Sequence, residues 1–439
     1  MKREKAVKVL EKAGLMKVRE EFVAYSKNRR KYTEEQLTEI NEYIMSDECA
    51  KDIERLKMGD YFLDYPQYRL IPKNYNKEKR AVYFFPGTEG YLMKLIAFAM
   101  RGLESIYSDR LFSFRPDKTG GDLLTEISRE RNVQNMYVLK TDVSNYVGSI
   151  VPELAIPMLE DVFIPDDPEF FSFLKWLLTR NKVIDFNGQI IDHCPGGMGG
   201  VPIGNYLMNL YLHEMDEYFA PRASLYARYS DDILICSYSH EEIRKYEEKF
   251  YEILDRLKLT VNKEKTKILM PGESFDLLGM ELGEGNIRLS GHSIKKIKRR
   301  IRRYADKALI SRNRGGLTKD EAACDLIIRF NRYFFGAEGS GNRITWSKWV
   351  FPVITEEDCL KEIDNYVRDS IRYVLYGSMK RRKNSISYEK LSELGYKTLV
   401  YYYHHQDRIE EIPRELTLKQ QDDICKETTD EENEGDAVQ

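Results

Sequence analysis

The feature that most restricts the fold is a polar turn between two apolar runs, in the segment Leu225–Ser237 (LYARYSDDILICS). Both runs have the β-branched and aromatic composition of strands, so the segment predicts a β-hairpin with Asp231 and Asp232 at its tip. A solvated surface turn is the alternative interpretation of an Asp-Asp pair. The apolar flanks favour a buried hairpin instead, where two adjacent carboxylates are costly unless cations compensate their charge. The chain is therefore expected to contain a sheet that carries acidic groups at one end.

A further carboxylate follows another predicted strand. Residues 136–141 (MYVLKT) have the composition of a buried strand, and Asp142 lies at its carboxyl end. Hard divalent cations require oxygen ligands, and carboxylates from two adjacent strands could converge on them. We predict that Asp142, Asp231 and the peptide carbonyl of Val143 bind two Mg²⁺ ions, with Mn²⁺ as an alternative. Asp232 is expected to support them.

The composition is that of a globular protein with two or three packed units, since 42% of its 439 residues are hydrophobic and 32% are charged. No stretch approaches the roughly 18 consecutive apolar residues that span a bilayer, and the first residues do not resemble a signal peptide. We therefore expect a cytoplasmic protein without a membrane partner. The six cysteines form no C-x-x-C pair, which argues against a disulfide framework and against a zinc ribbon.

The net charge of −3 conceals an uneven distribution. The last twenty residues carry eight acids against Lys426, so the rest of the chain carries about +4. A basic segment lies between Gly291 and Gly315, where the only acid is Asp306. This density is typical of phosphate neutralisation, although a solvated basic helix without a ligand is an equally good interpretation. The residues expected to contact nucleic acid are Lys295, Lys298, Arg299 and Arg302.

The chain divides into four predicted parts. Residues 1–60 have apolar positions at helical spacing and form a helical N-terminal extension. Residues 61–289 alternate short strands with helices. Residues 290–405 are helical and basic. Residues 406–439 are acidic, contain few apolar residues and are expected to be largely disordered.

Six motifs, in order, resemble those of bacterial reverse transcriptases related to group II intron and retron enzymes, over roughly residues 80–279. They are LFSFR (Leu111–Arg115), KTDVSNYVGSI around Asp142, GGMGGVPIGNYLMNLYLHEMD (Gly196–Asp216), RYSDD (Arg228–Asp232), LTVNKEKTKIL (Leu259–Leu269) and FDLLGMEL (Phe275–Leu282). The resemblance implies an α+β right-hand polymerase. Its fingers and palm would occupy 61–289, and its basic helical thumb with a C-terminal extension would occupy 290–405.

The resemblance also implies roles for side chains near the predicted metal site. Lys265 matches the position of a general acid that protonates the leaving pyrophosphate, although it could equally be a solvated lysine. The implied nucleotide-binding residues are Lys79, Arg80, Arg115, Tyr146, Val147, Gly200 and Asn209. Surface ion pairs are the alternative for the basic residues, and a flexible loop before a helix is the alternative for the glycine-rich segment.

Three positions depart from the family pattern. Gly204 and Asn205 replace a serine-proline or serine-glutamine pair, and Ser230 stands where alanine is familiar. Five residues after the metal-binding aspartate, the family usually has an aromatic ring that excludes the 2′-hydroxyl of a ribonucleotide. Val147 occupies that position here. The resemblance therefore predicts weak discrimination against ribonucleotides, unless the ring of Tyr146 fills the space.

Two smaller clusters favour packing over chemistry. His193 and Cys194 are adjacent, but no partner lies at metal-ligand spacing. The run from Tyr401 to Tyr403 with His404 and His405 could stack on bases, although packing of a terminal helix is the favoured interpretation.

The resemblance implies an RNA-directed DNA polymerase that uses dNTPs, an RNA template and Mg²⁺ to make a DNA product. The sequence lacks nuclease, zinc-ribbon and integrase signatures, and in this it is similar to defence-associated or abortive-infection enzymes. Two segments also resemble the thumb extension of those enzymes, namely ITWSKWVFP and IRYVLYGSMKRRKNSISYEKLSELGYKTLV. These enzymes would use a noncoding RNA in anti-phage defence. Template-independent or protein-primed synthesis is one alternative, and a non-catalytic RNA-binding protein of the same fold is another. An oligomer is compatible with the sequence.

Overall fold

The computed structural model describes residues 8–27, 32–72, 79–130, 132–194, 196–261, 266–283, 285–336, 345–377 and 386–411. The chain forms two compact units. Unit 1 comprises the residues up to Thr119 together with Tyr137–Leu269, and unit 2 comprises Gly120–Met136 and the residues from Met270 onward. These units are defined by packing. The four-part division expected from the sequence concerns functional regions and stays a prediction.

Unit 1 contains two antiparallel-rich sheets and a set of helices. Its strands are β1 (Gln67–Pro72), β2 (Lys79–Phe84), β3 (Tyr137–Asp142), β4 (Lys182–Ile184), β5 (Ile190–Asp192), β6 (Leu225–Tyr229), β7 (Asp232–Ser237) and β8 (Lys267–Leu269). Its helices are α1 (Val9–Gly14), α2 (Met16–Lys27), α3 (Glu34–Met45), α4 (Asp47–Lys57), α5 (Gly87–Ala99), η1 (Leu103–Ile106), η3 (Val147–Ser149), α7 (Pro152–Phe163), α8 (Pro168–Thr179), α9 (Gly204–Tyr211), α10 (His213–Phe219) and α11 (His240–Arg256).

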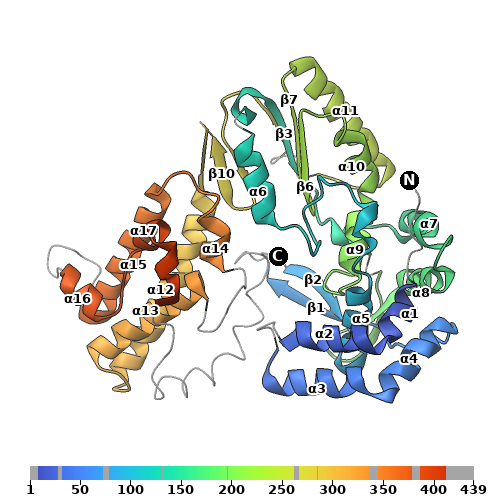
Figure 1. Ribbon diagram of the computed structural model, residues 1–439, viewed down its shortest axis with the longest axis horizontal. Helices are drawn as coiled ribbons and strands as arrows, with labels where there is room; N and C mark the ends of the chain where they lie inside the picture. Colours follow the sequence, from blue (N-terminus) through green and yellow to red (C-terminus); the bar gives the residue numbers. More distant parts are fainter. Residues whose placement is uncertain are drawn as a thin grey trace. The chain divides into compact units, whose positions relative to one another are not determined.

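The central sheet of unit 1 has the strand order β6-β7-β3-β8, with every neighbouring pair antiparallel. Its middle strands are apolar, and Leu139, Ile233 and Ile235 are fully buried. Burial of such side chains contributes about 1.5–3 kcal/mol each. Helix α11 packs along β7 and β3, as Figure 1 shows. The sheet is therefore a rigid platform whose strand ends can hold polar groups in fixed positions.

A second sheet in unit 1 has the order β2-β1-β4-β5. Strands β1 and β2 pair antiparallel along their whole length, and β1 meets β4 in parallel at Gln67 and Ile184. This sheet contacts the glycine-rich segment that precedes α9, because the backbone N–H of Tyr83 donates to the carbonyl of Gly199 at 2.8 Å.

The N-terminal helices belong to the same core. Helix α3 starts with a capping box, in which the Thr33 hydroxyl accepts from the Gln36 backbone and the Gln36 side chain accepts from the Thr33 backbone. Ile40 and Ile44 of α3 are buried against the rest of unit 1. The N-terminal segment, which the sequence predicts to be helical, is therefore packed into the core of unit 1.

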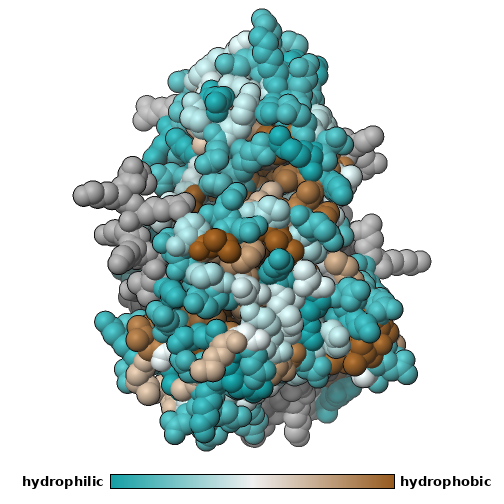
Figure 2. Space-filling model, turned by 90° about the vertical axis from the view of Figure 1, so that its right-hand side faces the viewer, coloured by the Kyte–Doolittle hydropathy of each residue, from teal (hydrophilic) through white to brown (hydrophobic). Residues whose placement is uncertain are grey.

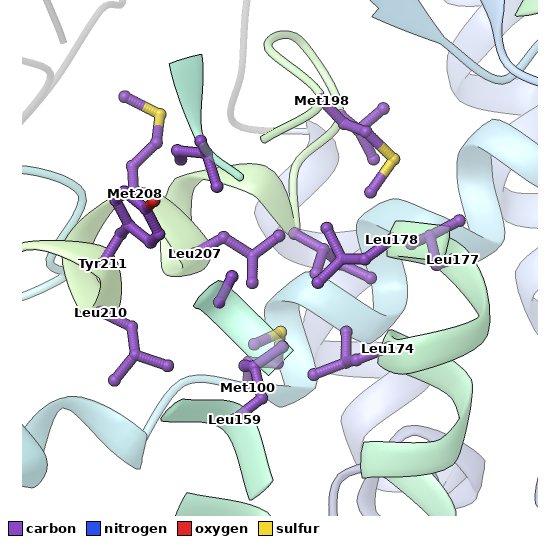
Figure 3. Close-up of a cluster of buried hydrophobic side chains, with 14 of the residues drawn as sticks. Met100, Leu159, Leu174, Leu177, Leu178, Met198, Leu207, Met208, Leu210 and Tyr211 are labelled. Carbon is purple, nitrogen blue, oxygen red and sulfur yellow. The ribbon is translucent and has the colours of Figure 1, made fainter. Parts of the chain in front are cut away.

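A buried hydrophobic cluster joins α7, α8 and α9 to the end of α5 (Figure 3). Leu207 of α9, Leu159 of α7 and Leu174 of α8 point toward one another, and Met198 brings the glycine-rich segment into the same cluster. Because protein interiors are close-packed, this cluster fixes the position of α9 and of the loop before it.

Unit 2 combines a small sheet with a helical bundle. Its elements are α6 (Gly120–Arg129), η2 (Val133–Asn135), β9 (Phe275–Leu277), β10 (Met280–Gly283), β11 (Asn286–Leu289), α12 (Gly291–Asn313), α13 (Lys319–Phe335), α14 (Trp346–Val350), α15 (Asp358–Tyr376), α16 (Tyr388–Glu393), α17 (Leu399–His404) and η4 (Gln406–Glu411). The sheet order is β11-β10-β9, and α12, α13 and α15 pack against one another. Helix α12 is buried along Ile294, Ile297 and Ile301, which is the helical spacing expected from the sequence.

The α+β class is confirmed, with a palm-type antiparallel sheet and long helical regions. In the part of the chain that the structure describes, no helix has the length and apolar character needed to cross a membrane. Figure 2 shows one face of the molecule, where hydrophilic residues predominate and hydrophobic residues form small separate groups. The cysteines in the described ranges are free thiols, namely Cys49, Cys194, Cys236, Cys324 and Cys359.

Candidate active site at the end of the central sheet

The strand register brings the predicted acidic positions together. Asp142, the last residue of β3, pairs directly with Asp232, the first residue of β7. The backbone N–H of Val143, which follows Asp142, donates to the carbonyl of Asp231, which precedes Asp232, at 3.3 Å. The side chain of Asp142 lies outside what the structure describes. The backbone alone places Asp142, Val143, Asp231 and Asp232 at one end of one sheet.

The hairpin turn consists of Ser230 and Asp231, between the paired residues Tyr229 and Asp232. Ser230 has φ +59°, a left-handed conformation that glycine usually provides in such turns. Two buried groups hold it there. The Ser230 N–H donates to Ser113 Oγ at 2.8 Å, and Arg228 Nη1 donates to the Ser230 carbonyl at 3.3 Å. The position of the Asp231 side chain therefore depends on a strained turn, which the buried side chains of Ser113 and Arg228 hold in place.

Arg228 is the centre of this support and is completely buried. Its guanidinium forms two hydrogen bonds with the buried carboxylate of Asp216 on α10, with Nε donating to Oδ1 at 2.7 Å. Tyr226 donates to the same carboxylate, and Arg228 Nη2 donates to the carbonyl of Asn209 at 3.0 Å. Burial opposes the charge of Arg228, but Asp216 outweighs it and raises the pKa of Arg228. Removing one partner of such a pair costs about 3–5 kcal/mol, since the other charge stays buried.

The glycine-rich loop lies between β2 and the segment after Asp142. On one side, the Gly197 N–H donates to the Val147 carbonyl at 2.8 Å. On the other side, Gly200 has φ +105°, and a Cβ at this position would lie 2.7 Å from the carbonyl oxygen of Tyr83. No side chain fits there without displacing backbone. The glycines therefore allow three segments to approach closely, beside the acidic end of the sheet.

Tyr146 and Val147 face different surroundings. Tyr146 is 2% exposed, and its hydroxyl donates to the carbonyl of Met208 in α9. Burial raises its pKa, although the positive charge of Arg228 opposes the shift. Val147 is half-buried beside Gly199, where a Cβ would lie 3.1 Å from Val147 Cγ1. The hydroxyl of Tyr146 thus anchors its ring to α9, whereas Val147 packs against the glycine-rich loop.

A family model described as "Reverse transcriptase (RNA-dependent DNA polymerase)" matches residues 72–282, which include every element of this site. Residues 72–282 form a reverse transcriptase domain.

Other comparisons cover less of the proteins concerned. A putative enzymatic polyprotein of Cassava vein mosaic virus is 34% identical over 89 residues, which are 20% of this chain and 13% of the polyprotein. Telomerase from Candida albicans, in complex with a fragment of telomeric RNA, matches 79% of this chain and 60% of its own, with 10% identity and a TM-score of 0.43. Apo telomerase from Candida tropicalis matches 75% of this chain and 60% of its own, with 10% identity and a TM-score of 0.40. The chain thus spans less than two thirds of each.

Other predicted nucleotide-binding residues of the reverse transcriptase domain differ in accessibility. Lys79 and Arg80 are exposed at the start of β2. Arg115 makes two hydrogen bonds to the Asp117 carboxylate, at 3.0 and 2.7 Å, and a third to the Ser108 carbonyl. The Arg115 guanidinium lowers the pKa of Asp117. The ion pair that was the alternative interpretation of Arg115 is therefore present.

Asn209 is 1% exposed, and both of its side-chain polar atoms bond to Ser113. In this structure it supports the hairpin turn through Ser113 and through its carbonyl, which accepts from Arg228. Lys265 lies outside the described residues, so its role as general acid stays a prediction.

Sequence reasoning missed the supporting residues Ser113, Asp216 and Arg228. One signal was present for Arg228, since an arginine within the apolar strand LYARY requires a buried partner. The identity of that partner could not be read from spacing, because Asp216 and Ser113 come from distant segments.

The predicted nucleic-acid-binding residues of α12 fall into two groups. Lys298 binds Glu362 at 2.6 Å and lies over the ring of Tyr366, and Arg302 binds Asp306 at 3.0 Å and lies over the ring of Tyr373. Lys295 and Arg299 are exposed on the helix surface. Lys298 and Arg302 are thus partly engaged in ion pairs and ring contacts within unit 2.

The two smaller clusters are packed only in part, because Cys194, His404 and His405 are exposed. His193 Nε2 hydrogen-bonds the Tyr83 hydroxyl at 2.6 Å and its ring lies against Tyr68. Tyr402 is buried against Phe335, whereas Tyr401 is half-buried and stacks on His405.

Proposed function

We propose that this chain is an RNA-directed DNA polymerase, which adds dNTPs to a primer on an RNA template. One observation carries the proposal, namely the register that sets Asp142 opposite Asp232 beside the Ser230–Asp231 turn, within the reverse transcriptase domain. Such a polymerase needs carboxylates fixed at one point, and a buried ion pair and a buried serine hold this turn in place.

The donor set suits two Mg²⁺ ions, or Mn²⁺ in their place. Hard cations take oxygen ligands, and this end of the sheet offers the carboxylates of Asp142 and Asp231 and the Val143 carbonyl, with Asp232 in support. Bound there, the ions would activate the primer 3′ oxygen and neutralise the leaving pyrophosphate. The chain's own part is to fix these oxygens, while the glycine-rich loop packs against Val147.

The biological role that we propose is anti-phage defence, with a noncoding RNA as template or scaffold. The support is the similarity of the segments around Trp346 and Tyr373 to defence-associated enzymes. The exposed cations Lys295 and Arg299 offer contacts to an RNA backbone.

The test is Mg²⁺-dependent dNTP incorporation on a primed RNA template. Asp231→Ala and Asp142→Ala should each abolish incorporation, while RNA binding stays within about twofold, because phosphate neutralisation uses other residues. Asp255→Ala removes an exposed carboxylate at the end of α11 and is the matched control, expected to be active. Undiminished synthesis by either active-site variant would refute the assignment. Loss of RNA binding with it would show that the carboxylates are structural.

A further inference from the structure

A lysine is paired with one of the active-site carboxylates. Lys140 Nζ lies 3.5 Å from Oδ1 of Asp232, and the two side chains are 17% and 31% exposed. Both are shielded more than a typical surface pair, so solvent screens their attraction only in part. Nothing in the proposed catalytic role of the aspartates requires this cation.

The position of Lys140 follows from the strand register. It precedes Asp142 by two residues in β3, and side chains two apart on a strand share one face of the sheet. Asp232 pairs with Asp142 across the neighbouring strand and belongs to that face, and Lys267 pairs with Lys140 from the other side. The sheet therefore builds one positive charge into the carboxylate cluster itself.

We propose that Lys140 is a positioning residue that serves as the resident counter-cation of Asp232 and weakens the binding of divalent ions to the free protein. Its ammonium group balances one carboxylate when no metal is bound. A divalent ion entering the cluster is repelled by Lys140 and must compete with it for Asp232. The site then fills effectively only when a nucleotide contributes the negative charge of its phosphates. This inference rests on the proposed function, in which these aspartates bind divalent ions.

The experiment measures Mn²⁺ binding to the nucleotide-free full-length protein, by electron paramagnetic resonance of free Mn²⁺. Binding that is lost in Asp231→Ala is taken as the active-site component. Lys140→Gln should lower the apparent dissociation constant of that component by about tenfold, because one repelling charge is removed. Lys140→Arg keeps the charge and should stay within about twofold of the native protein. Lys267→Gln removes a neighbouring exposed lysine on strand β8, and should change the constant less than threefold.

A second readout separates this role from a folding defect. Without metal, Lys140→Gln should unfold at a lower temperature than the native protein, since the ion pair between Lys140 and Asp232 is lost. A saturating concentration of Mn²⁺ should then raise its unfolding temperature by more than it raises that of the native protein, because tighter binding stabilises more.

The outcomes distinguish this inference from the proposed function. If the native protein incorporates dNTPs but Lys140→Gln binds Mn²⁺ as the native protein does, the counter-cation role is wrong and the polymerase assignment stands. An equal gain in Lys267→Gln would also overturn it, because the effect would then be one of general charge. If neither the native protein nor Lys140→Gln has an active-site Mn²⁺ component, and no dNTP is incorporated, both proposals fail.

Discussion

Ser113 and Ser230 are 117 residues apart in the chain, yet the backbone N–H of Ser230 donates to Ser113 Oγ at 2.8 Å. The same hydroxyl donates to Asn209 Oδ1 at 3.1 Å, so one buried oxygen joins the hairpin turn to α9. The left-handed conformation of Ser230, next to Asp231, is thereby held by the side chain of Ser113. Ser113 itself makes no contact with substrate in the proposed mechanism.

Ser113→Ala should impair both stability and synthesis. The substitution leaves the Ser230 N–H and Asn209 Oδ1 without a partner in a buried site, which costs about 1–3 kcal/mol in the free energy of unfolding. Relaxation of the turn should lower kcat for dNTP incorporation by about tenfold or more, with a smaller effect on KM. Urea denaturation and steady-state incorporation measure the two effects. Ser172→Ala, at an exposed position of α8, is the control. Native kcat in Ser113→Ala would show that the turn holds itself.

The basic helix α12 should contact nucleic acid mainly through its exposed residues. Lys295→Gln with Arg299→Gln should weaken binding of unrelated RNA sequences alike and flatten the salt dependence by about 0.7–0.9 per lost contact. Lys298→Gln with Arg302→Gln removes the same charge from residues bound to Glu362 and Asp306, and should change the slope less. Filter binding from 50 to 300 mM salt gives the slopes. Equal slopes for the native protein and the first double variant would make α12 a solvated surface.

Val147 should admit ribonucleotides. Since the hydroxyl of Tyr146 bonds to α9, we expect the Tyr146 ring not to replace the aromatic side chain that is missing at position 147. Val147→Phe should restore exclusion of the 2′-hydroxyl and raise the preference for dATP over ATP by about tenfold to a hundredfold. Val147→Leu should give an intermediate value. The measurement is kcat/KM for both nucleotides on one RNA template. A native enzyme that rejects ATP as strongly as the Phe variant would exclude Val147 as the determinant.

Asp364 should make unit 2 less stable as pH rises. Its buried carboxylate accepts hydrogen bonds from the Tyr396 hydroxyl and from the backbone N–H groups of Leu399 and Val400. Burial raises the pKa of Asp364 to about 6, although these hydrogen bonds oppose the shift. The unfolded chain has a pKa of about 3.9, so the folded state binds this proton more tightly. The stability from this group is complete below about pH 4 and is lost as pH rises through about 6.

Asp364→Asn removes this titration. Between pH 4 and pH 7, the native protein should lose about 2 kcal/mol of unfolding free energy relative to the Asn variant. Urea denaturation of both proteins across this range tests the difference. Asp358→Asn, at an 84% exposed position of the same helix, should show no such trend. A constant difference between the native protein and Asp364→Asn would contradict the assignment.

The sequence was sufficient to predict the hairpin and its partner strand, because both depend on local patterns. Apolar runs around Asp231 and before Asp142 have the composition of buried strands, and the structure pairs them in register. The helical spacing of Ile294, Ile297 and Ile301 likewise specified which face of α12 is buried.

The supporting residues could not be predicted in the same way. The bonds of Ser113 to Ser230 and of Asp216 to Arg228 join segments whose proximity depends on the whole sheet and on the packing of α9 and α10. For Asn209, a motif position suggested contact with the nucleotide, whereas its side chain bonds to Ser113. Supporting side chains such as Ser113 and Asp216 therefore produce no spacing pattern in the sequence.

The buried pair of Arg228 and Asp216 has a consequence for how this sequence can change over generations. Loss of either charge alone leaves the other charge unpaired in the core, next to the Ser230–Asp231 turn. The two positions are therefore epistatic, and a lineage that replaces one must replace the other nearly simultaneously or pass through an intermediate that folds poorly. A hydrophobic pair of similar volume could restore folding, but it would give no hydrogen bond to the Ser230 carbonyl. The ion pair can therefore be replaced without loss of the fold, but not without loss of the support that Arg228 gives to the turn.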